Sequence, residues 1–381
     1  MADDPQHLAG VLEVDEVSVA TSGDYQRYFF KDGIRYHHIL DPSNGYPAHA
    51  RLRGTTVIAP DCATADALAT AAIVFRAYDR LPDVSPVQEA TEATQELSRY
   101  REQLVKEQTA KLNRLHRYLA NQYPTYKTFF SKLNGVTALH FWATYPTPAH
   151  LRATTLDELA DFFHDKSKHS LGLEAARQKA SQIFNALDDA PMSELGLLAE
   201  AQGAIILDLA QRLLQLKRSL EVIEAHLEET VPATGQQLET FQGIGTVSAA
   251  VLIGETRDTA RFNHDKDRFA KYNGSAPVTK GTGQHARQVE NHWCNRRLKS
   301  TLGQVALVAR HNEPLSAEYY QACLDRGLDS GEAHKRLMRR LSDIVFAMMR
   351  DKTPYDPEIQ RRKQQLHKRK GKSVAPAVAG D

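Results

Sequence analysis

Two glycines flank one apolar residue in the C-terminal half of the chain, at Gly243-Ile-Gly245. Glycine adopts the backbone conformations of a tight turn easily, so this tripeptide can present its N–H groups outward. The small-residue helix expected directly after it adds the positive end of a helix dipole. Such a turn can hold a phosphate group without reading a base, as helix-hairpin-helix motifs do. An ordinary glycine-capped turn between two helices is the alternative.

Basic side chains follow this turn and are candidates for contact with a phosphate backbone. They are Lys280, Arg287, Arg296, Arg297 and Lys299. Arginine suits this role best, because its planar guanidinium can donate two parallel hydrogen bonds to one phosphate. The formal net charge of the whole chain is only +1. The sequence therefore predicts local basic faces on a nearly neutral protein.

Two long helices are predicted upstream of these residues. The first covers residues 86–120 and ends before Pro124. The second covers residues 193–230 and ends at Val231-Pro232. The second helix carries a heptad seam of apolar residues, either packed against residues 86–120 of the same chain or joining two subunits. The seam consists of Ile206, Leu209, Leu213, Leu216, Leu220, Ile223 and Leu227.

The predicted fold is mainly α-helical, with a small α+β fragment at the N-terminus. No apolar run is long enough to cross a membrane, no leader peptide is recognisable, and three scattered cysteines do not indicate disulfides or zinc. We therefore expect a cytoplasmic protein without membrane contact. The expected regions are an α+β fragment (1–75), a helical linker (76–192), a coiled-coil helix (193–231), a helix-hairpin-helix domain (232–357) and a basic flexible tail (358–381).

Several separated motifs of the C-terminal half share their order with a known family. The glycine turn is followed by residues 261–277 (RFNHDKDRFAKYNGSAP), 279–283 (TKGTG) and 291–302 (NHWCNRRLKSTL). This order resembles the C-terminal domain of transposases of the insertion sequence 110 family, and the similarity extends over about residues 66–360. The resemblance implies DNA binding, DNA transposition by recombination, a structured guide RNA as a second partner and assembly into a homo-oligomer.

The resemblance also implies a catalytic hydroxyl. In the family, a serine within a Ser-Gly pair attacks a DNA phosphodiester, and this position reads Thr282-Gly283 here. The additional methyl of threonine restricts its side-chain rotation and crowds the attack. The family begins with a RuvC-like domain whose acidic residues bind a divalent metal, but Ala63 stands three residues before Asp66 where a second acid is expected. The sequence therefore predicts a truncated or chimeric transposase of impaired activity.

The N-terminal residues resemble a different family. Residues 17–30, 36–45 and 65–70 (ADALAT) are similar to the C-terminal part of ApbE-type FAD:protein FMN transferases, over about residues 10–75. Their pattern predicts a hairpin with a turn at Lys31-Asp-Gly33, a further strand and a helix from about Asp61. A gene rearrangement, an insertion into a flavin transferase gene and an assembly artefact would each create such a junction.

This second resemblance implies that Asp66 and Thr70 are magnesium ligands. Carboxylate and hydroxyl oxygens suit Mg²⁺, and their spacing places both on one helix face. A helix-start charge and a packed threonine are the alternative interpretation. Magnesium-dependent flavin transfer is accordingly the alternative function, but we do not expect FAD to bind. The large N-terminal portion of that family, which forms most of the flavin pocket, cannot fit into the few residues before Val17.

Overall fold

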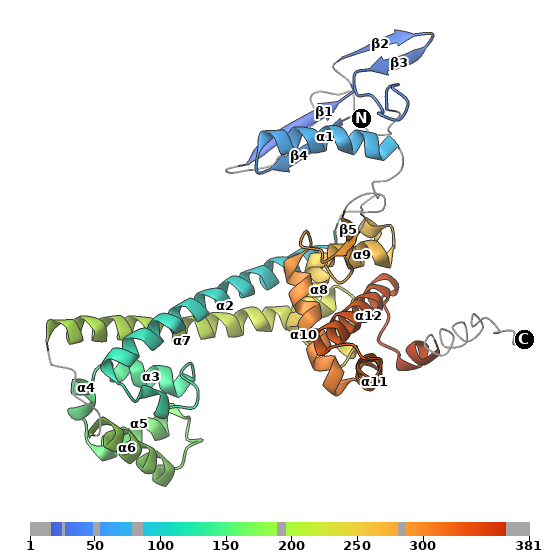
Figure 1. Ribbon diagram of the computed structural model, residues 1–381. Coiled ribbons are helices and arrows are strands. Elements are labelled where there is room, and N and C mark those ends of the chain that lie inside the picture. Colours follow the sequence, from blue (N-terminus) through green and yellow to red (C-terminus); the bar gives the residue numbers. More distant parts are fainter. Residues whose placement is uncertain are drawn as a thin grey trace, which may run out of the picture. The chain divides into compact units, whose positions relative to one another are not determined.

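A computed structural model of the chain describes residues 17–24, 27–48, 54–77, 87–188, 196–280 and 287–362. The described part is mainly helical, with short strands at the N-terminus, in agreement with the predicted fold class at this level of detail (Figure 1). Its contacts divide the chain into residues 1–85 with 260–264, and residues 86–259 with 265–381. None of the described helices combines the length and apolar character needed to cross a membrane.

The first unit contains two antiparallel strand pairs and one helix. Its elements are β1 (Ser18–Gly23), β2 (Tyr28–Lys31), β3 (Ile34–His37), β4 (Gly54–Ala59) and α1 (Cys62–Ala77). β1 pairs with β4, and β2 pairs with β3 in a hairpin. Asp32 and Gly33 form its turn with φ angles of 51° and 75°, as the primed hairpin turns require. The predicted hairpin, the later strand and the helix are therefore confirmed.

The apolar core of the first unit is small. Ile39, Ala48 and Ile73 form its buried cluster, and Ala65 and Ala69 of α1 are also buried. Many of its large apolar side chains are instead exposed: Tyr28, Phe29, Phe30, Ile34, Leu40 and Tyr46 are each 47–65% exposed. The described residues of this unit thus bury little of their own apolar surface.

The second unit is almost entirely helical. Its helices are α2 (Glu89–Gln122), α3 (Val136–Thr144), α4 (Pro148–Arg152), α5 (Leu156–Lys166), α6 (Leu173–Asp188), α7 (Leu197–Ala233), α8 (Thr246–Thr256), α9 (Lys266–Tyr272), α10 (Arg296–Asn312), α11 (Pro314–Leu324) and α12 (Ser330–Asp351). Short 3-10 helices lie at η1 (Tyr126–Thr128), η2 (Leu238–Thr240) and η3 (Thr259–Phe262), the last mostly within the residues grouped with the first unit. Strands β5 (Val278–Lys280) and β6 (Arg287–Val289) pair antiparallel.

The two long helices α2 and α7 pack side by side and run in opposite directions (Figure 1). Ile206, Leu213 and Leu227 of the heptad seam are fully buried within this single chain. Of the two arrangements left open by the sequence, packing inside one chain is therefore the one observed. The helix break predicted at Val231-Pro232 and the Ala-Thr-Gly that follows is observed, because α7 ends at Ala233 and the left-handed Gly235 comes two residues later. A proline near a helix end removes only one backbone hydrogen bond, and this explains its tolerance there.

A lobe of helices lies at each end of the long pair (Figure 1). The lobe of α3 to α6 has an aromatic core, in which Phe141 and Trp142 are completely buried and Phe141 stacks on Phe163. The C-terminal lobe of α8 to α12 buries Leu298 and Leu302 of α10. This C-terminal lobe carries most of the residues that the sequence selects as a site.

Candidate nucleic-acid interface

The glycine turn connects η2 to α8, so no long helix directly precedes it. Gly243 has a φ angle of 115°, a left-handed conformation that favours glycine. A Cβ atom on Gly243 would lie 3.5 Å from the backbone nitrogen of Ala309 and from Cγ1 of Val308, both on α10. Gly243 therefore allows close packing of the turn on α10. Gly245, by contrast, is exposed, has no neighbour within 4 Å of such an atom, and precedes α8 without a side-chain cap.

A carboxylate already lies near the first turn of α8. The hydroxyl of Thr246 is 2.6 Å from Oε1 of Glu239, to which it donates a hydrogen bond. A negative charge at this position competes with a phosphate for the positive end of the helix. The turn is thus open to solvent at Gly245, but it carries an acidic neighbour that the sequence pattern did not reveal.

A buried charge network joins α2, α8 and α10. The carboxylate of Glu255 on α8 is only 4% exposed and accepts hydrogen bonds from Arg99, Asn295 and Arg297. Arg297 also pairs with Glu102 of α2. Burial alone would raise the pKa of Glu255, but the hydrogen bonds from Arg99 and Asn295 and the charges of both arginines hold it below its ordinary value. The network fixes three helices that are distant in sequence.

The two adjacent arginines of the predicted site have different environments. Arg297 is half-buried and engaged by both carboxylates of the network. Arg296 is exposed at the first position of α10, and its side chain has no partner among the described residues. Only Arg296 therefore has a guanidinium available for an added anion.

Further cations gather around Glu290, which follows β6. Nζ of Lys299 lies 2.6 Å from Oε1 of Glu290, and Nζ of Lys335 on α12 lies 3.9 Å from its Oε2. The hydrogen bond from Lys299 and the charges of Lys299, Lys335 and His292 lower the pKa of Glu290. One carboxylate is thus surrounded by several cations, and this part of the surface remains positive.

The remaining predicted residues of this lobe are described only partly. Thr282 lies outside the described residues, between β5 and β6. Lys280 and Arg287 occupy opposite positions in the ladder of these two strands. Ser275, a second hydroxyl in the matched motifs, is buried, and its Oγ donates a hydrogen bond to the carbonyl of Ala270.

The structure does not bring the predicted contacts into one cluster. The glycine turn packs on α10 at Val308 and Ala309, whereas Arg296 and Lys299 lie at its first turn. At 1.5 Å per residue these regions are roughly 15 Å apart along the helix. They form two patches on one element.

Asp66 and Thr70 lie one turn apart on α1, as their spacing predicts. Both are exposed, and Oγ1 of Thr70 is 2.8 Å from Oγ of Ser22 on β1. No group of three or more histidine, cysteine or acidic residues that could hold a metal occurs among the described residues. Mg²⁺ takes six oxygen ligands, of which several are usually water or substrate phosphate, so these two side chains could supply only part of its coordination.

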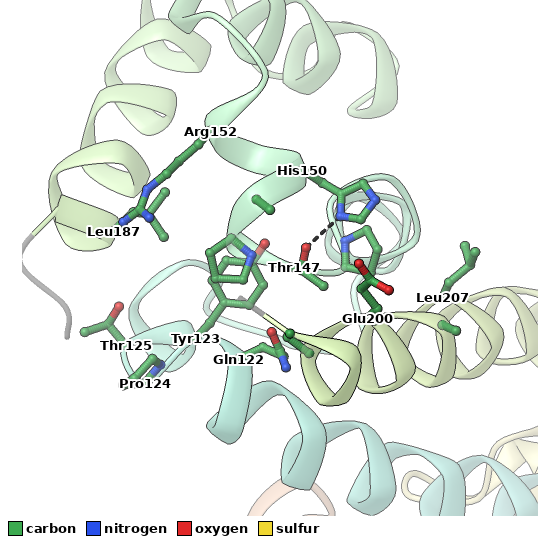
Figure 2. Close-up of a pocket in the computed structure, with 17 residues that line it drawn as sticks. Gln122, Tyr123, Pro124, Thr125, Thr147, His150, Arg152, Leu187, Glu200 and Leu207 are labelled. Carbon is green, nitrogen blue, oxygen red and sulfur yellow. Dashed lines mark hydrogen bonds between the residues drawn. The ribbon is translucent and has the colours of Figure 1, made fainter. Parts of the chain in front are cut away.

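A cavity of about 850 Å³ lies in the second unit, near the ends of α2 and α6 and the start of α7. Figure 2 shows Tyr123, Pro124 and Leu187 on its wall, with Thr147 hydrogen-bonded to His150 at 2.7 Å. Its lining is predominantly apolar and contains none of the residues predicted from the sequence. We therefore do not place the functional site here.

The sequence did not single out two residues of the C-terminal lobe that the structure makes prominent. Glu255 is the one charged residue of α8, whose other residues are mostly small or apolar. A single acid in such a helix indicates a buried carboxylate with a cationic partner. Trp293 is 94% exposed between Asn291 and Arg296. A single tryptophan within a polar and basic run is a signal of its own, because aromatic side chains between cationic residues can stack on nucleic-acid bases.

Comparisons with known proteins match the two ends of the chain to different families, and the N-terminal match extends into α2. Residues 2–116 match the ApbE family, and residues 235–321 match the transposase IS116/IS110/IS902 family. An FAD:protein FMN transferase of Treponema pallidum is 51% identical over 70 residues, which are 18% of this chain and 19% of that protein.

The longer matches are proteins of two insertion elements. A 44.8 kDa protein of insertion element IS116 from Streptomyces clavuligerus is 26% identical over 68% of this chain and 64% of its own length. A 43.6 kDa protein of IS110 from Streptomyces coelicolor is 26% identical over 79% of this chain and 74% of its own length. The chain thus spans about a fifth of the flavin transferases and about two thirds or more of the insertion-element proteins. It therefore carries a domain of the transposase IS116/IS110/IS902 family, joined to an N-terminal segment of the ApbE family.

Proposed function

We propose that the C-terminal lobe binds the phosphate backbone of nucleic acid as part of DNA transposition. The observation that carries this proposal is the exposed Arg296, which has no side-chain partner among the described residues and lies one helical turn before Lys299 in the matched transposase domain. Arg296 and Lys299 then contact phosphates, and Gly245 at the start of α8 offers a second contact. DNA, a structured guide RNA and a second copy of the chain belong to this proposal as partners.

Arg297 has a different role in this proposal. Its guanidinium pairs with Glu102 and Glu255 and is therefore a positioning group for α10. A phosphate could recruit Arg297 only by displacing two carboxylates, one of them buried. Loss of a partner from a buried ion pair is costly, at about 3–5 kcal/mol. We therefore assign the phosphate contact to Arg296 and the structural contact to Arg297.

Strand transfer is a separate part of the proposal. The hydroxyl of Thr282 would attack a phosphodiester, lose its proton to a base and release a DNA hydroxyl. The methyl group of threonine and the alanine at position 63 both argue for impaired activity. We expect no recombination by this chain alone, either before or after Thr282→Ser. Recombination that Thr282→Ala abolishes would contradict this expectation.

Binding is testable by titrating a fluorescent DNA oligonucleotide with the full chain at several salt concentrations. Affinity should fall steeply as salt rises, because phosphate contacts release counterions. Arg296→Ala should reduce the slope of log affinity against log salt by about one, uniformly across sequences. Absence of binding, or binding that salt does not weaken, would contradict the proposal.

A second candidate function rests on the N-terminal match to flavin transferases. Asp66 and Thr70 would then contribute two oxygens toward Mg²⁺, while FAD phosphates supplied with the substrate would have to complete its coordination. We infer that the segment does not transfer FMN, because the match covers only 19% of the flavin transferase. Gel filtration of the purified chain after incubation with FAD and Mg²⁺ tests this inference. A flavin absorption spectrum in the protein peak would overturn it.

A further inference from the structure

Trp293 projects into solvent from a fixed segment of backbone. Its side chain is 94% exposed, and no aromatic ring or cation of the described residues covers it. Its backbone N–H donates to Oδ1 of Asn291 at 2.9 Å, and Nδ2 of the buried Asn291 donates to the carbonyl of Lys271 at 2.6 Å. On the other side, the N–H of Asn295 donates to the carbonyl of Tyr272 at 2.8 Å. The indole is therefore presented by a rigid turn and not by a loose loop.

The surroundings of this indole are cationic. Arg296 and Lys271 are exposed and have no side-chain partner among the described residues. His292 is exposed directly before Trp293. Lys299 and Lys335 form ion pairs with Glu290. A ligand that covers the indole thus meets several positive charges at its edge.

The indole does not belong to a larger apolar patch. The other large apolar side chains exposed in the described C-terminal lobe are Leu307, Val308 and Ile359, on the later turns of α10 and beyond α12. Interfaces between proteins usually contain a contiguous apolar centre, which a single exposed indole does not provide. An unpaired base combines a flat face for the indole with a neighbouring phosphate for the cations.

We propose that Trp293 is a stacking platform for an unpaired base of single-stranded nucleic acid, either DNA or RNA. Phosphates flanking this base contact Arg296 and Lys271. Duplex bases are already stacked on each other, so the site discriminates in favour of single strands or unpaired loops. This inference deepens the proposed function and depends on it.

The test uses the full chain with oligothymidylate, oligouridylate and a blunt DNA duplex of the same length. Stacking energies predict that Trp293→Ala weakens single-strand binding by about 5-fold to 100-fold, with a smaller effect on the duplex. Trp293→Phe should retain most of the affinity, because a ring remains. The salt dependence should be unchanged in Trp293→Ala but reduced in Arg296→Ala. Leu197→Ala, which removes another highly exposed side chain, should have no effect.

Fluorescence gives an independent measurement, because the chain has only two tryptophans. Trp142 is completely buried, so quenching by acrylamide should report on Trp293. Oligonucleotide binding should quench the emission of Trp293 and protect it from acrylamide, and both changes should be lost in Trp293→Phe.

The possible results separate this inference from the proposed function. Salt-dependent binding by the wild type, with full affinity in Trp293→Ala and no quenching, would overturn the stacking site alone. A Trp293→Ala variant that changes the molar mass in light scattering but keeps its affinity would identify a subunit contact instead. A wild-type chain that binds no oligonucleotide would overturn the proposed function and the stacking site together.

Discussion

The two units of this chain differ in how far they bury their large apolar side chains. The C-terminal lobe of the second unit buries large residues completely, whereas the first unit leaves Phe29 and Phe30 more than 60% exposed. The chain also covers about a fifth of the flavin transferases, against about two thirds or more of the insertion-element proteins. The difference shows that a segment can keep the local turns of its family without enough surrounding structure to cover its apolar face.

A pair of phenylalanines tests this difference most strongly. Phe241 is 1% exposed and packs against Tyr355 in the C-terminal lobe, whereas Phe30 is 65% exposed. We expect Phe241→Ala to destabilise the second unit by about 3–5 kcal/mol. Phe30→Ala should change stability by less than about 0.5 kcal/mol. Denaturant unfolding, monitored by circular dichroism, measures both changes in stability. Equal losses of stability in the two variants would contradict the difference in burial between the two units.

The adjacent arginines give the next largest effect. Arg297→Ala leaves Glu102 and Glu255 short of a cation and should destabilise the second unit by about 3 kcal/mol. Arg296→Ala should leave thermal unfolding nearly unchanged while weakening oligonucleotide binding. Calorimetry and a binding titration on the same two variants separate these roles. Normal stability of Arg297→Ala with reduced binding would reverse our assignment.

Two glycines sharpen the comparison within the second unit. A Cβ atom at Gly254 would lie 2.8 Å from Cα of Gln95 on α2, whereas one at Gly245 meets nothing within 4 Å. Gly254→Ala should therefore cost about 1–3 kcal/mol through forced separation of α2 and α8. Gly245→Ala should destabilise the second unit by less than about 1 kcal/mol, since it changes only the N-cap residue of α8. Thermal unfolding of both variants checks this expectation, which a stable Gly254→Ala would refute.

The buried acid predicts a dependence on pH. The pKa of Glu255 is below its ordinary value of 4.5 in the folded chain, so its ionised form favours folding. This contribution is complete above about pH 4.5 and is lost as the pH falls through the folded-state pKa. Glu255→Gln should thus be less stable than wild type at neutral pH, by about 1–3 kcal/mol. Denaturant unfolding should show that this difference in stability between the two proteins decreases below pH 4.5. A difference that stays constant with pH would contradict its assignment to the ionised Glu255.

Local features were predicted well from the sequence. The Asp32-Gly33 turn and the end of α2 before Pro124 follow from residue types that act on their own neighbours. Contacts between distant residues were not predictable in this way, since Arg297 meets Glu102 across 195 positions of the chain. A basic residue near a predicted site is therefore ambiguous until its partners are known. Arg296 and Arg297 have the same side chain but different roles, because successive residues of a helix point to different sides.

Photocrosslinking tests the central claim most directly, because it compares the two units in a single sample. The full chain would be irradiated with a single-stranded oligonucleotide containing photoreactive thymidine analogues, digested and mapped by mass spectrometry. We predict that the main crosslinks fall on the peptide containing Trp293 and Arg296, and that added salt reduces them. Crosslinks confined to residues 17–77, or spread evenly over both units, would contradict a nucleic-acid interface at the start of α10.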